Sequence, residues 1–394
     1  MDAVDLVIVG SGLAGLSVAS FAAKDRRVLV LDQGSQAGAE ASSQNAGMVR
    51  RLGEDPHERA LALRSAAWLA DPPPGFEHAS RVSGALIGLV LDPTHLNDAV
   101  AHLRAAGVRV EACDRPADVA PATRGARLSA AWWLPDERVA DPHALLSGFT
   151  RVIRRHNGRI QQRVRVEGLV VRGGRVEGVR TSVGTIHTDQ VVFATGAWSA
   201  GLAAAEGLDR PLIPLRRTLI QTAPHALSDR AHPWTWLDDV GVYARPESGG
   251  WLVSGCDEIE ASVQPGPGSR GPVEVEHAAL AVDKLARHLP ALADAELRGG
   301  WTGLRTFAPD RRPVLGPDPD LVGLAWATGL GGFGVTCCVA AGEAVAAWIR
   351  GEDVPWLRAA AVSPGRQFPR RWPVRTDGSV HGARLRPVRV RDLA

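Results

Sequence analysis

The chain has 394 residues, a length that suits two domains or one large one and a substantial core without disulfide cross-links. Hydrophobic residues make up 45% and charged residues 22%, which is ordinary for a globular protein and excludes a mainly disordered or collagen-like chain. The 45 basic residues nearly balance the 43 acidic ones, so we expect no bulk binding of nucleic acid, which needs a concentrated positive field.

Cysteine spacing gives no sign of a metal site. Cys113, Cys256, Cys337 and Cys338 form no C-x-x-C pair, so we expect neither zinc nor a disulfide framework but buried thiols in a reducing compartment. No apolar run approaches the ~20 residues of a membrane span, and no basic segment followed by an apolar stretch opens the chain. The expectation is therefore a cytoplasmic protein without an integral membrane segment.

The start of the chain predicts a dinucleotide-binding unit. An apolar strand at Asp5–Val9 leads into the glycine turn Gly10–Gly15, and an alanine-rich helix follows over Leu16–Lys24. A second apolar run, Val28–Leu31, ends in Asp32. This order of strand, glycine turn, helix, strand and acid is typical of nucleotide binding in a parallel sheet.

Each residue of that motif has a physical task. Gly10 permits the tight turn, Gly12 lets the backbone approach a pyrophosphate, and Gly15 lets the helix pack closely on the strand. The helix N-terminus offers free N–H groups to the phosphates. Asp32 stands where a carboxylate accepts from ribose hydroxyls, which disfavours a 2′-phosphate. The motif alone does not separate FAD from NAD.

Later segments extend the α/β pattern. Val164–Gly196 contains short β-rich runs and closes in a strand that meets a glycine turn, and Trp234–Ser254 also predicts strands. Residues 274–290 predict a helix. Near the end, a strand at Leu324–Thr328 precedes a glycine-rich turn and a helix over Val335–Ile349, so we expect the chain to return to the first sheet.

The segment Ala41–Met48 (ASSQNAGM) resembles the loop after the second strand in FAD-dependent enzymes of the D-amino-acid and glycine oxidase family. The resemblance to this family spans about residues 3–368. Within the family, the likeness is greatest to D-arginine dehydrogenase and includes Asp71–Phe76 and Arg216–Arg217. Further segments that carry the resemblance to the family are Ala194–Ser199, Val242–Pro246, Trp301–Arg305, Pro309–Asp310, Gly329–Gly334 and Ser363–Arg366.

The resemblance implies an α/β fold in which a Rossmann-like FAD-binding domain of the glutathione-reductase type is interrupted by a substrate domain with a mixed β-sheet. The FAD-binding pieces would be residues 1–80, 141–212 and 300–365. The substrate domain would comprise 81–140 and 213–299. Residues 366–394, rich in arginine and proline, would form a loosely packed tail.

The resemblance also implies which residues contact FAD, which we expect to be bound without a covalent link because no cysteine lies near Gly303 in the sequence. The glycine turn before the last helix would aim N–H groups at the flavin pyrimidine carbonyl and stabilise the negative charge that reduction places there. Besides Gly10, Gly12 and Gly15, the implied contacts are Ala14, Asp32, Gln33, Ser42, Ser43, Gln44, Asn45, Ala46, Gly47, Met48, Val166, Gly331, Gly332, Phe333, Gly334, Val335 and Thr336.

Four residues are implied at the reacting centre. Arg305 stands at the family's carboxylate-binding position, and Arg217 matches a second such position in D-arginine dehydrogenase; a guanidinium suits a carboxylate because it donates two parallel hydrogen bonds. Tyr243, the chain's only tyrosine, falls where the family places one in the substrate pocket, with strand packing as the alternative role. Gly332 would contribute an N–H toward the flavin.

Two departures from D-arginine dehydrogenase bear on the substrate. The stretch Met48–Gly53 lacks that relative's histidine and tyrosine, and Gly84–Ile87 is apolar where the relative has an acid that pairs the substrate guanidinium. A cationic side chain would be left unpaired in a closed pocket, at a large cost. The added pair Arg50–Arg51 is either a solvated loop or a preference for an acidic substrate, so we expect an apolar or acidic substrate side chain.

The resemblance thus implies FAD-dependent oxidative deamination of an α-amino acid, preferably a D-amino acid, to the imino and then the 2-oxo acid. The alternatives are oxidation of a 2-hydroxy acid or an N-methyl amino acid, a flavin-carrying subunit of an electron-transfer complex, or an NAD-dependent dehydrogenase. The family's sarcosine-type oxidases place a lysine beside the flavin, whereas Gly250–Gly255 has none. We therefore expect a quinone or another redox partner as electron acceptor, with oxygen as the alternative.

Overall fold

The computed structural model describes residues 4–369. Their first sheet has six strands in the order β20-β21-β13-β1-β2-β9. The central pairings are parallel, and only β20 runs antiparallel to its neighbour. The strands are β1 (Leu6–Val9), β2 (Val28–Leu31), β9 (Arg159–Gln161), β13 (Val191–Phe193), β20 (Val314–Pro317) and β21 (Leu324–Thr328).

Both faces of this sheet are covered, as expected for short apolar strands without polar alternation. On one face Leu6 and Ile8 pack into a core with α1 (Leu13–Ala22), α2 (Pro56–Ala70), α5 (Pro142–Arg155) and α8 (Gly334–Ile349). On the other face Val7 and Val9 pack against a three-stranded sheet of β10 (Val166–Arg172), β11 (Arg175–Thr181) and β12 (Gly184–His187).

A second, mixed sheet of nine strands lies beside the first. Its order is β18-β14-β17-β16-β15-β5-β7-β6, with β19 paired to β14; β15 is parallel to β5 and the other pairings are antiparallel. The strands are β5 (Ala85–Leu89), β6 (Glu111–Ala112), β7 (Ala130–Leu134), β14 (Ile213–Thr222), β15 (Trp234–Leu237), β16 (Val242–Glu247), β17 (Gly250–Ser254), β18 (Ile259–Glu260) and β19 (Leu297–Phe307). The predicted combination of a nucleotide-binding sheet with a mixed sheet is confirmed.

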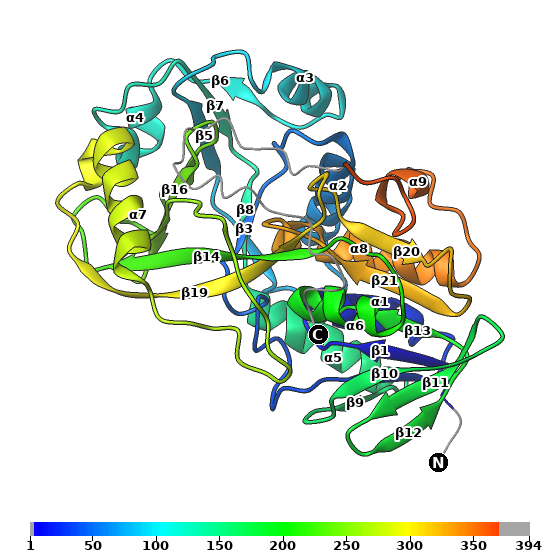
Figure 1. Cartoon of the computed structure of the whole chain (residues 1–394). Coiled ribbons are helices and arrows are strands. Elements are labelled where there is room, and N and C mark those ends of the chain that lie inside the picture. Colours follow the sequence, from blue (N-terminus) through cyan, green and yellow to red (C-terminus); the bar gives the residue numbers. More distant parts are fainter. Residues whose placement is uncertain (1–3, 370–394) are drawn as a thin grey trace.

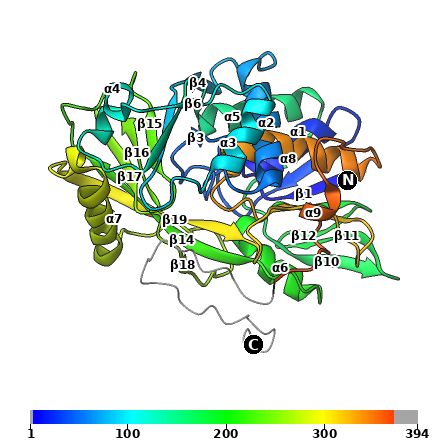
Figure 2. The same cartoon turned by 90° about the horizontal axis from the view of Figure 1, so that it is seen from above.

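Short elements complete the described chain. A small sheet of β3 (Met48–Val49), β8 (Arg138–Ala140) and β4 (Ser80–Val82) pairs segments that are distant in the sequence. In Figures 1 and 2, α7 lies at one end of the molecule and β10–β12 lie at the other. The remaining helices are α3 (Asn97–Ala105), α4 (Pro116–Val119), α6 (Ser199–Ala205), α7 (Val275–His288) and α9 (Ala359–Val362).

The predicted secondary structure is largely confirmed, including α7, β21 and α8. The helix expected from Leu16 begins earlier, at Leu13, because Gly12 is its extended N-cap residue with φ −72° and ψ 178°. The division into domain pieces stays a prediction, and β19 crosses its boundary at residue 300 because this strand pairs along β14. Residues 370–394 of the expected tail lie outside the described residues, whereas Arg366 forms an ion pair with Asp310 at 2.7 Å.

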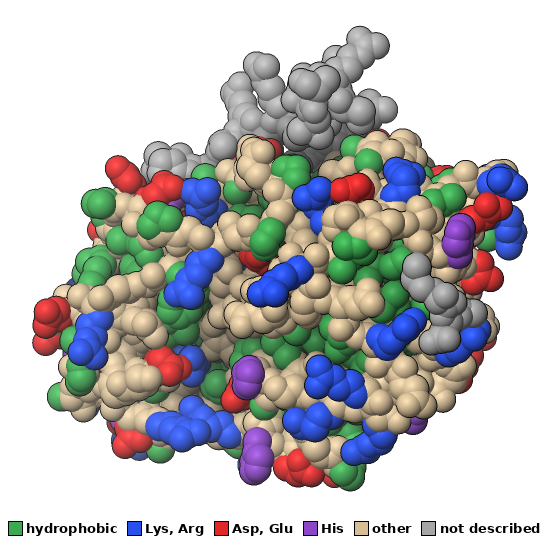
Figure 3. Space-filling view, turned by 90° about the horizontal axis from the view of Figure 1, so that it is seen from below, with side chains coloured by type: hydrophobic (Ala, Val, Ile, Leu, Met, Phe, Trp, Pro, Cys, Tyr) green, Lys and Arg blue, Asp and Glu red, His purple; other side chains and the backbone are tan. Residues whose placement is uncertain are grey.

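Charges of both signs are interspersed on the face shown in Figure 3. This distribution agrees with the nearly balanced composition and shows no single-sign field on that face. None of the helices between residues 4 and 369 is long and apolar enough to cross a membrane.

The contact between α1 and α8 gives a test of the first core. A Cβ at Gly342 would lie 2.1 Å from Ser17 Oγ and 2.7 Å from its backbone carbon, so Gly342→Ala should force the helices apart. We expect a loss of about 1–3 kcal/mol in the free energy of unfolding, as for other overpacked cores, measured by urea unfolding of the FAD-loaded protein.

Gly299→Ala is the matched control, because a Cβ at this strand position meets nothing within 4 Å. We expect it to leave the stability unchanged or to raise it by about 0.4–1 kcal/mol through the unfolded chain. Equal effects of the two substitutions would contradict the close packing of α1 on α8.

Candidate active site

The glycine turn after β1 is as tight as its sequence predicts. Gly10 has φ +106°, and a Cβ there would lie 2.4 Å from the Ala194 carbonyl oxygen. A Cβ at Gly15 would lie 1.9 Å from the Gly10 carbonyl oxygen, so α1 can pack on the turn only without a side chain at that position. Asp32 accepts hydrogen bonds from the N–H of Ser11 at 2.6 Å and from its hydroxyl at 2.7 Å, which ties the acid to the turn.

A cavity of about 710 Å³ opens at this turn, at the carboxyl ends of parallel strands, where such folds bind nucleotides. Gly15, Ser43, Gln44, Ala46, Gly47, Met48, Phe333 and Thr336 lie outside its lining. The predicted FAD contacts that do line the cavity are Gly10, Gly12, Ala14, Asp32, Gln33, Ser42, Asn45, Val166, Gly331, Gly332, Gly334 and Val335.

The turn before α8 offers fewer donors than expected. The Gly331 N–H already donates to the Thr306 carbonyl at 2.9 Å, and the Phe333 N–H donates to the Leu330 carbonyl at 2.9 Å. The resemblance implied that the N–H groups of Gly331 and Phe333 donate to the flavin. This prediction is corrected, because both N–H groups donate to backbone carbonyls that close the turn. The Gly332 N–H has no acceptor among residues 4–369, and Gly332 lines the same cavity as Gly334 and Val335 in the first turn of α8.

Arg305, in β19, lines the same cavity. It pairs in register with Leu215, and Gly303 pairs with Arg217, so the side chains of Arg217 and Arg305 share one face of the sheet. Arg305 is only 9% exposed. Its guanidinium donates to the carbonyl oxygens of Gln44 and, at 3.0 Å, Leu304.

No acidic side chain within residues 4–369 forms an ion pair with Arg305. Burial lowers the pKa of this guanidinium to about 10; Tyr243 and Asp257 oppose that shift, and Arg217 adds to it. A buried cation without a counter-ion is costly. The geometry therefore leaves a place for an anion in the cavity.

Tyr243 lies beside this cation, in β16. It is 4% exposed, and its ring stacks on Trp236 with centroids 4.8 Å apart. Burial raises the pKa of the phenol to about 12, and Cys256 adds to the rise while Arg217 and Arg305 oppose it. The hydroxyl therefore stays protonated at neutral pH and can donate a hydrogen bond.

Arg217 differs from Arg305 because it is already paired. Its Nε donates to the Asp257 carbonyl at 3.0 Å, and its Nη2 lies 2.9 Å from Glu258 Oε1. Burial disfavours the charge, but Cys256, Glu258 and Tyr243 together raise the pKa of the guanidinium. Its predicted role as a second carboxylate ligand stays a prediction.

Cys256 also belongs to this cluster, since it packs with Tyr243, Leu219 and Ala46. In the sequence no cysteine lies near Gly303, but in the fold Cys256 lies near Arg217, the residue that pairs with Gly303. The distance of the cysteines along the sequence therefore does not by itself support non-covalent FAD.

Arg50 is not part of a solvated loop, so that interpretation of the pair Arg50–Arg51 is wrong. Arg50 Nη1 lies 2.5 Å from Asp238 Oδ1, and its guanidinium lies between the rings of Trp236 (4.2 Å) and Phe333 (4.5 Å). Arg51 lies beside the fully buried carboxylate of Glu137. Sequence reasoning missed Trp236 and Asp238, which no local motif marks as site residues.

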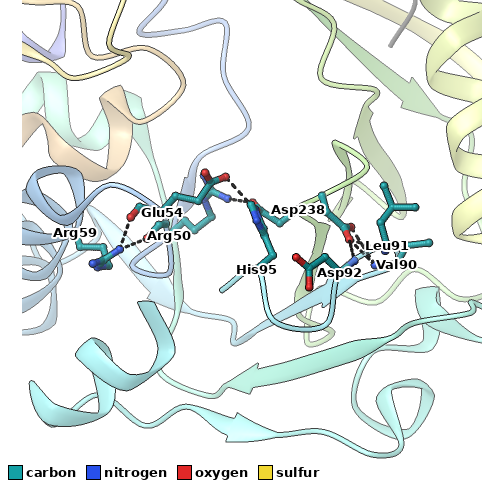
Figure 4. Close-up of polar contacts among 10 residues, drawn as sticks. Arg50, Glu54, Arg59, Val90, Leu91, Asp92, His95 and Asp238 are labelled. Carbon is teal, nitrogen blue, oxygen red and sulfur yellow. Dashed lines mark hydrogen bonds and ion pairs between the residues drawn. The ribbon is translucent and has the colours of Figure 1, made fainter. Parts of the chain in front are cut away.

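Figure 4 shows the charged cluster around Arg50. His95 Nε2 lies 3.1 Å from Glu54 Oε1 and 3.4 Å from Asp238 Oδ2. These three side chains could share a cation, but Arg50 already supplies a positive charge to Asp238. The cluster joins the loop after β3 to the segments that follow β5 and β15.

Comparison with known proteins identifies the family. Residues 5–348 match the family model of FAD-dependent oxidoreductases named DAO. The chain belongs to this family. It is therefore an FAD-dependent oxidoreductase, and its cavity fits that cofactor: two glycines leave the backbone open at the turn, a helix N-terminus faces the space, and Gly332 offers an unpartnered N–H.

Relatives in this family act on amino acids. A D-amino acid dehydrogenase from Cereibacter sphaeroides is 32% identical over 312 residues, covering 77% of this chain and 67% of that protein. A glycine oxidase from Pseudomonas putida is 28% identical over 330 residues, covering 81% and 87%. An L-proline dehydrogenase from P. horikoshii shares the fold, with a TM-score of 0.82 at 22% identity over 92% of this chain and 97% of that one.

The charged cluster predicts a pH dependence of stability. Its hydrogen bond to Asp238 is the main reason that the pKa of His95 rises from 6.5 to about 9. Because the folded-state pKa lies above the unfolded one, the stabilisation is fully present below pH 6.5 and is lost as the pH rises through about 9. We expect His95→Gln to lower the melting temperature at pH 6 and to have no effect at pH 10.

Thermal unfolding of the FAD-loaded proteins across this pH range measures the difference. His102→Gln is the control, because this imidazole lies on exposed α3. A gap between wild type and His95→Gln that stays constant from pH 6 to 10 would show that His95 is not held as a cation.

Proposed function

We propose that this protein catalyses the FAD-dependent oxidative deamination of a D-amino acid to the imino acid, which water then converts to the 2-oxo acid and ammonia. One observation carries the proposal: Arg305 is buried, lines the FAD cavity and forms no ion pair with an acidic side chain among residues 4–369. A substrate carboxylate would supply the missing counter-ion through two parallel hydrogen bonds. A pure electron carrier has no use for such a site.

Arg305 and Tyr243 would bind the carboxylate together, one by charge and one by its phenolic hydroxyl. FAD, when bound in this cavity, would supply the oxidising chemistry of the reaction. The residues supply orientation, which holds the α-carbon at one place in the cavity.

Removal of a proton from the amine needs no protein base if the amine binds neutral. Asp257 is the acid whose charge reaches Arg305. Its two oxygens already accept from the Thr218 N–H and hydroxyl, both at 2.8 Å. The carboxylate of Asp257 is thus used to hold β14 and is not a candidate base.

The D configuration is supported by the D-amino acid dehydrogenases, which are 32–33% identical to this chain. Oxidation of a 2-hydroxy acid or an N-methyl amino acid would use the same carboxylate site and is the second candidate.

The proposed electron acceptor is a quinone or another redox partner, with oxygen as the slower alternative. β17 carries no lysine, and the Lys284 ammonium is held by the carbonyls of Val240 and Gly255 at 2.8 and 3.0 Å. We also propose non-covalent FAD and a cytoplasmic location, the latter supported by the free thiols of Cys113, Cys337 and Cys338.

Arg305→Ala tests the carboxylate site. We expect it to retain FAD and to lose roughly 2–5 kcal/mol of transition-state stabilisation, because a charge-assisted pair disappears from a desolvated site. The measurement is the rate of anaerobic flavin bleaching by substrate. Arg216→Ala is the control: it removes the same charge from the neighbouring position of β14, where the side chain pairs with Glu274 outside the cavity.

A loss of less than tenfold in kcat/KM for Arg305→Ala would remove this arginine from the site. An equal loss in Arg216→Ala would point to a general effect of charge on this sheet.

We propose that the substrate has an apolar or acidic side chain and not a basic one. Arg50 lies between the rings of Trp236 and Phe333 and is already paired with Asp238, and Trp236 stacks on Tyr243. A basic side chain would meet the positive charge of Arg50, whose acidic partner Asp238 is already in use. In a panel of D-amino acids, kcat/KM for D-leucine or D-phenylalanine should exceed that for D-arginine and D-lysine by roughly tenfold or more. D-arginine or D-lysine as the best substrate would contradict this assignment.

A further inference from the structure

A second cavity, of about 1260 Å³, lies on the outer side of the loop that borders the FAD cavity. Its walls are the loop over residues 36–47, one side of α5 along its whole length, the segments at 77–81 and 139–141, and the turn between β16 and β17. Three acidic side chains face it, Glu77, Asp141 and Glu247, against five arginines. These are Arg81, Arg151, Arg154, Arg230 and Arg245.

The three acids are already engaged. Glu77 accepts from the Gly75 N–H at 2.8 Å. Asp141 caps α5 by accepting from the N–H groups of the residues at the start of the helix, at 2.9 and 3.0 Å. Glu247 is paired with Arg245.

Most of the arginines, in contrast, lack an acceptor. Arg81, which is half-buried, and Arg154 and Arg230, which are exposed, make no side-chain hydrogen bond or ion pair within residues 4–369. Arg245 Nε is buried without a partner. The pKa of Arg81 is lowered by burial and by the charges of Arg230 and Arg245. The cavity therefore holds an excess of positive charge that a bound anion would relieve.

The position of this cavity relates it to the flavin. Gly38, Ala39, Ser42 and Asn45 line both cavities, so one segment of chain separates their contents. In the small sheet, Arg81 pairs with Val139, which pairs with Met48. Two strand spacings place Arg81 about 10 Å from Met48 along the sheet.

The inner side of the same loop faces the candidate active site. Ala46 packs in one cluster with Tyr243 and Met48, and the Met48 carbonyl accepts from the Thr336 hydroxyl at the start of α8. A molecule in the arginine-lined cavity would thus lie close to the flavin without entering the substrate site.

We propose that the arginine-lined cavity is the docking site of an anionic small-molecule electron acceptor that reoxidises the flavin. The proposal rests on the proposed function, since it assigns the oxidative half of the same reaction. The reduced flavin would lose two electrons and two protons. An anionic quinone would take up the two electrons and the two protons and become the hydroquinone. An anionic one-electron acceptor would react twice, and the two protons would pass to water.

Two iron complexes of opposite charge test the site. The enzyme is reduced anaerobically and mixed with ferricyanide, a trianion, or ferrocenium, a monocation, and flavin reoxidation is followed by stopped-flow absorbance. We expect Arg81→Gln and Arg230→Gln each to slow reoxidation by ferricyanide roughly tenfold at low ionic strength. Reoxidation by ferrocenium should stay unchanged or become faster.

Arg175→Gln is the matched control. Arg175 is exposed on β11, far along the chain from the cavity lining, and makes no side-chain ion pair within the described residues. Its loss removes the same net charge, so the ferricyanide rate should remain at the wild-type value if the effect is local.

A binding measurement without turnover completes the test. Ferrocyanide does not oxidise or reduce the resting flavin, and calorimetric titration of the oxidised holoenzyme should show one site that Arg81→Gln and Arg230→Gln weaken about tenfold. Equal ferricyanide rates in all variants, or no ferrocyanide binding, would overturn the proposal. A parallel loss of the ferrocenium rate would also overturn it, because the loop and not the charge would then be responsible.

Two further outcomes separate this proposal from its premise. If the arginine variants slow flavin bleaching by the amino acid, the cavity admits substrate and the acceptor assignment is wrong. If no amino acid bleaches the wild-type flavin, the proposed function fails. The enzyme reduced with dithionite would then still report whether the cavity selects an anionic acceptor.

Discussion

The buried guanidinium of Arg305 is the constraint on which the site depends. It is fixed by the β14–β19 ladder of the second sheet and donates to the Gln44 carbonyl of the loop that borders the first. One side chain thus connects the two halves of the active site. Since no acid within the described residues neutralises it, the folded protein retains an unsatisfied positive charge whose free-energy cost a substrate carboxylate can remove.

The surroundings of Arg305 are otherwise closed and mostly neutral. Tyr243 stays protonated because burial raises its pKa, and Arg217 is satisfied by Glu258. Arg50 is held by Asp238 and by two aromatic rings. Arg217 and Arg50 thus have acidic partners, whereas Arg305 forms no ion pair with an acid among residues 4–369. The arginine-lined cavity lies on the outer side of the same loop. Among its arginines, Arg81, Arg154 and Arg230 form no ion pair within the described residues.

Local pattern sufficed for the nucleotide-binding half. Gly15 meets the Gly10 carbonyl, and Asp32 meets Ser11, within a single strand–turn–helix–strand unit, so their spacing already contains the geometry. The close neighbour of Gly10 is Ala194, which follows β13 and which the local motif does not reveal. The same holds for β21 and α8, whose glycine turn and apolar helix are continuous in the chain. Resemblance to the oxidase family marked Arg305 and Tyr243, although nothing local to either residue shows that they meet.

The sequence by itself determined the dinucleotide fold, the class of mixed α/β architecture and the family, because these depend on periodicity and on motifs of adjacent residues. Tertiary structure decided which charges are paired. Arg50 and Asp238 are 188 positions apart, so no sequence spacing predicts that they neutralise each other. Arg81 and Arg230 come from separate parts of the chain, so no spacing predicts that they line a common cavity. Long-range sheet pairing sets those distances, and electrostatic energy depends on distance in space.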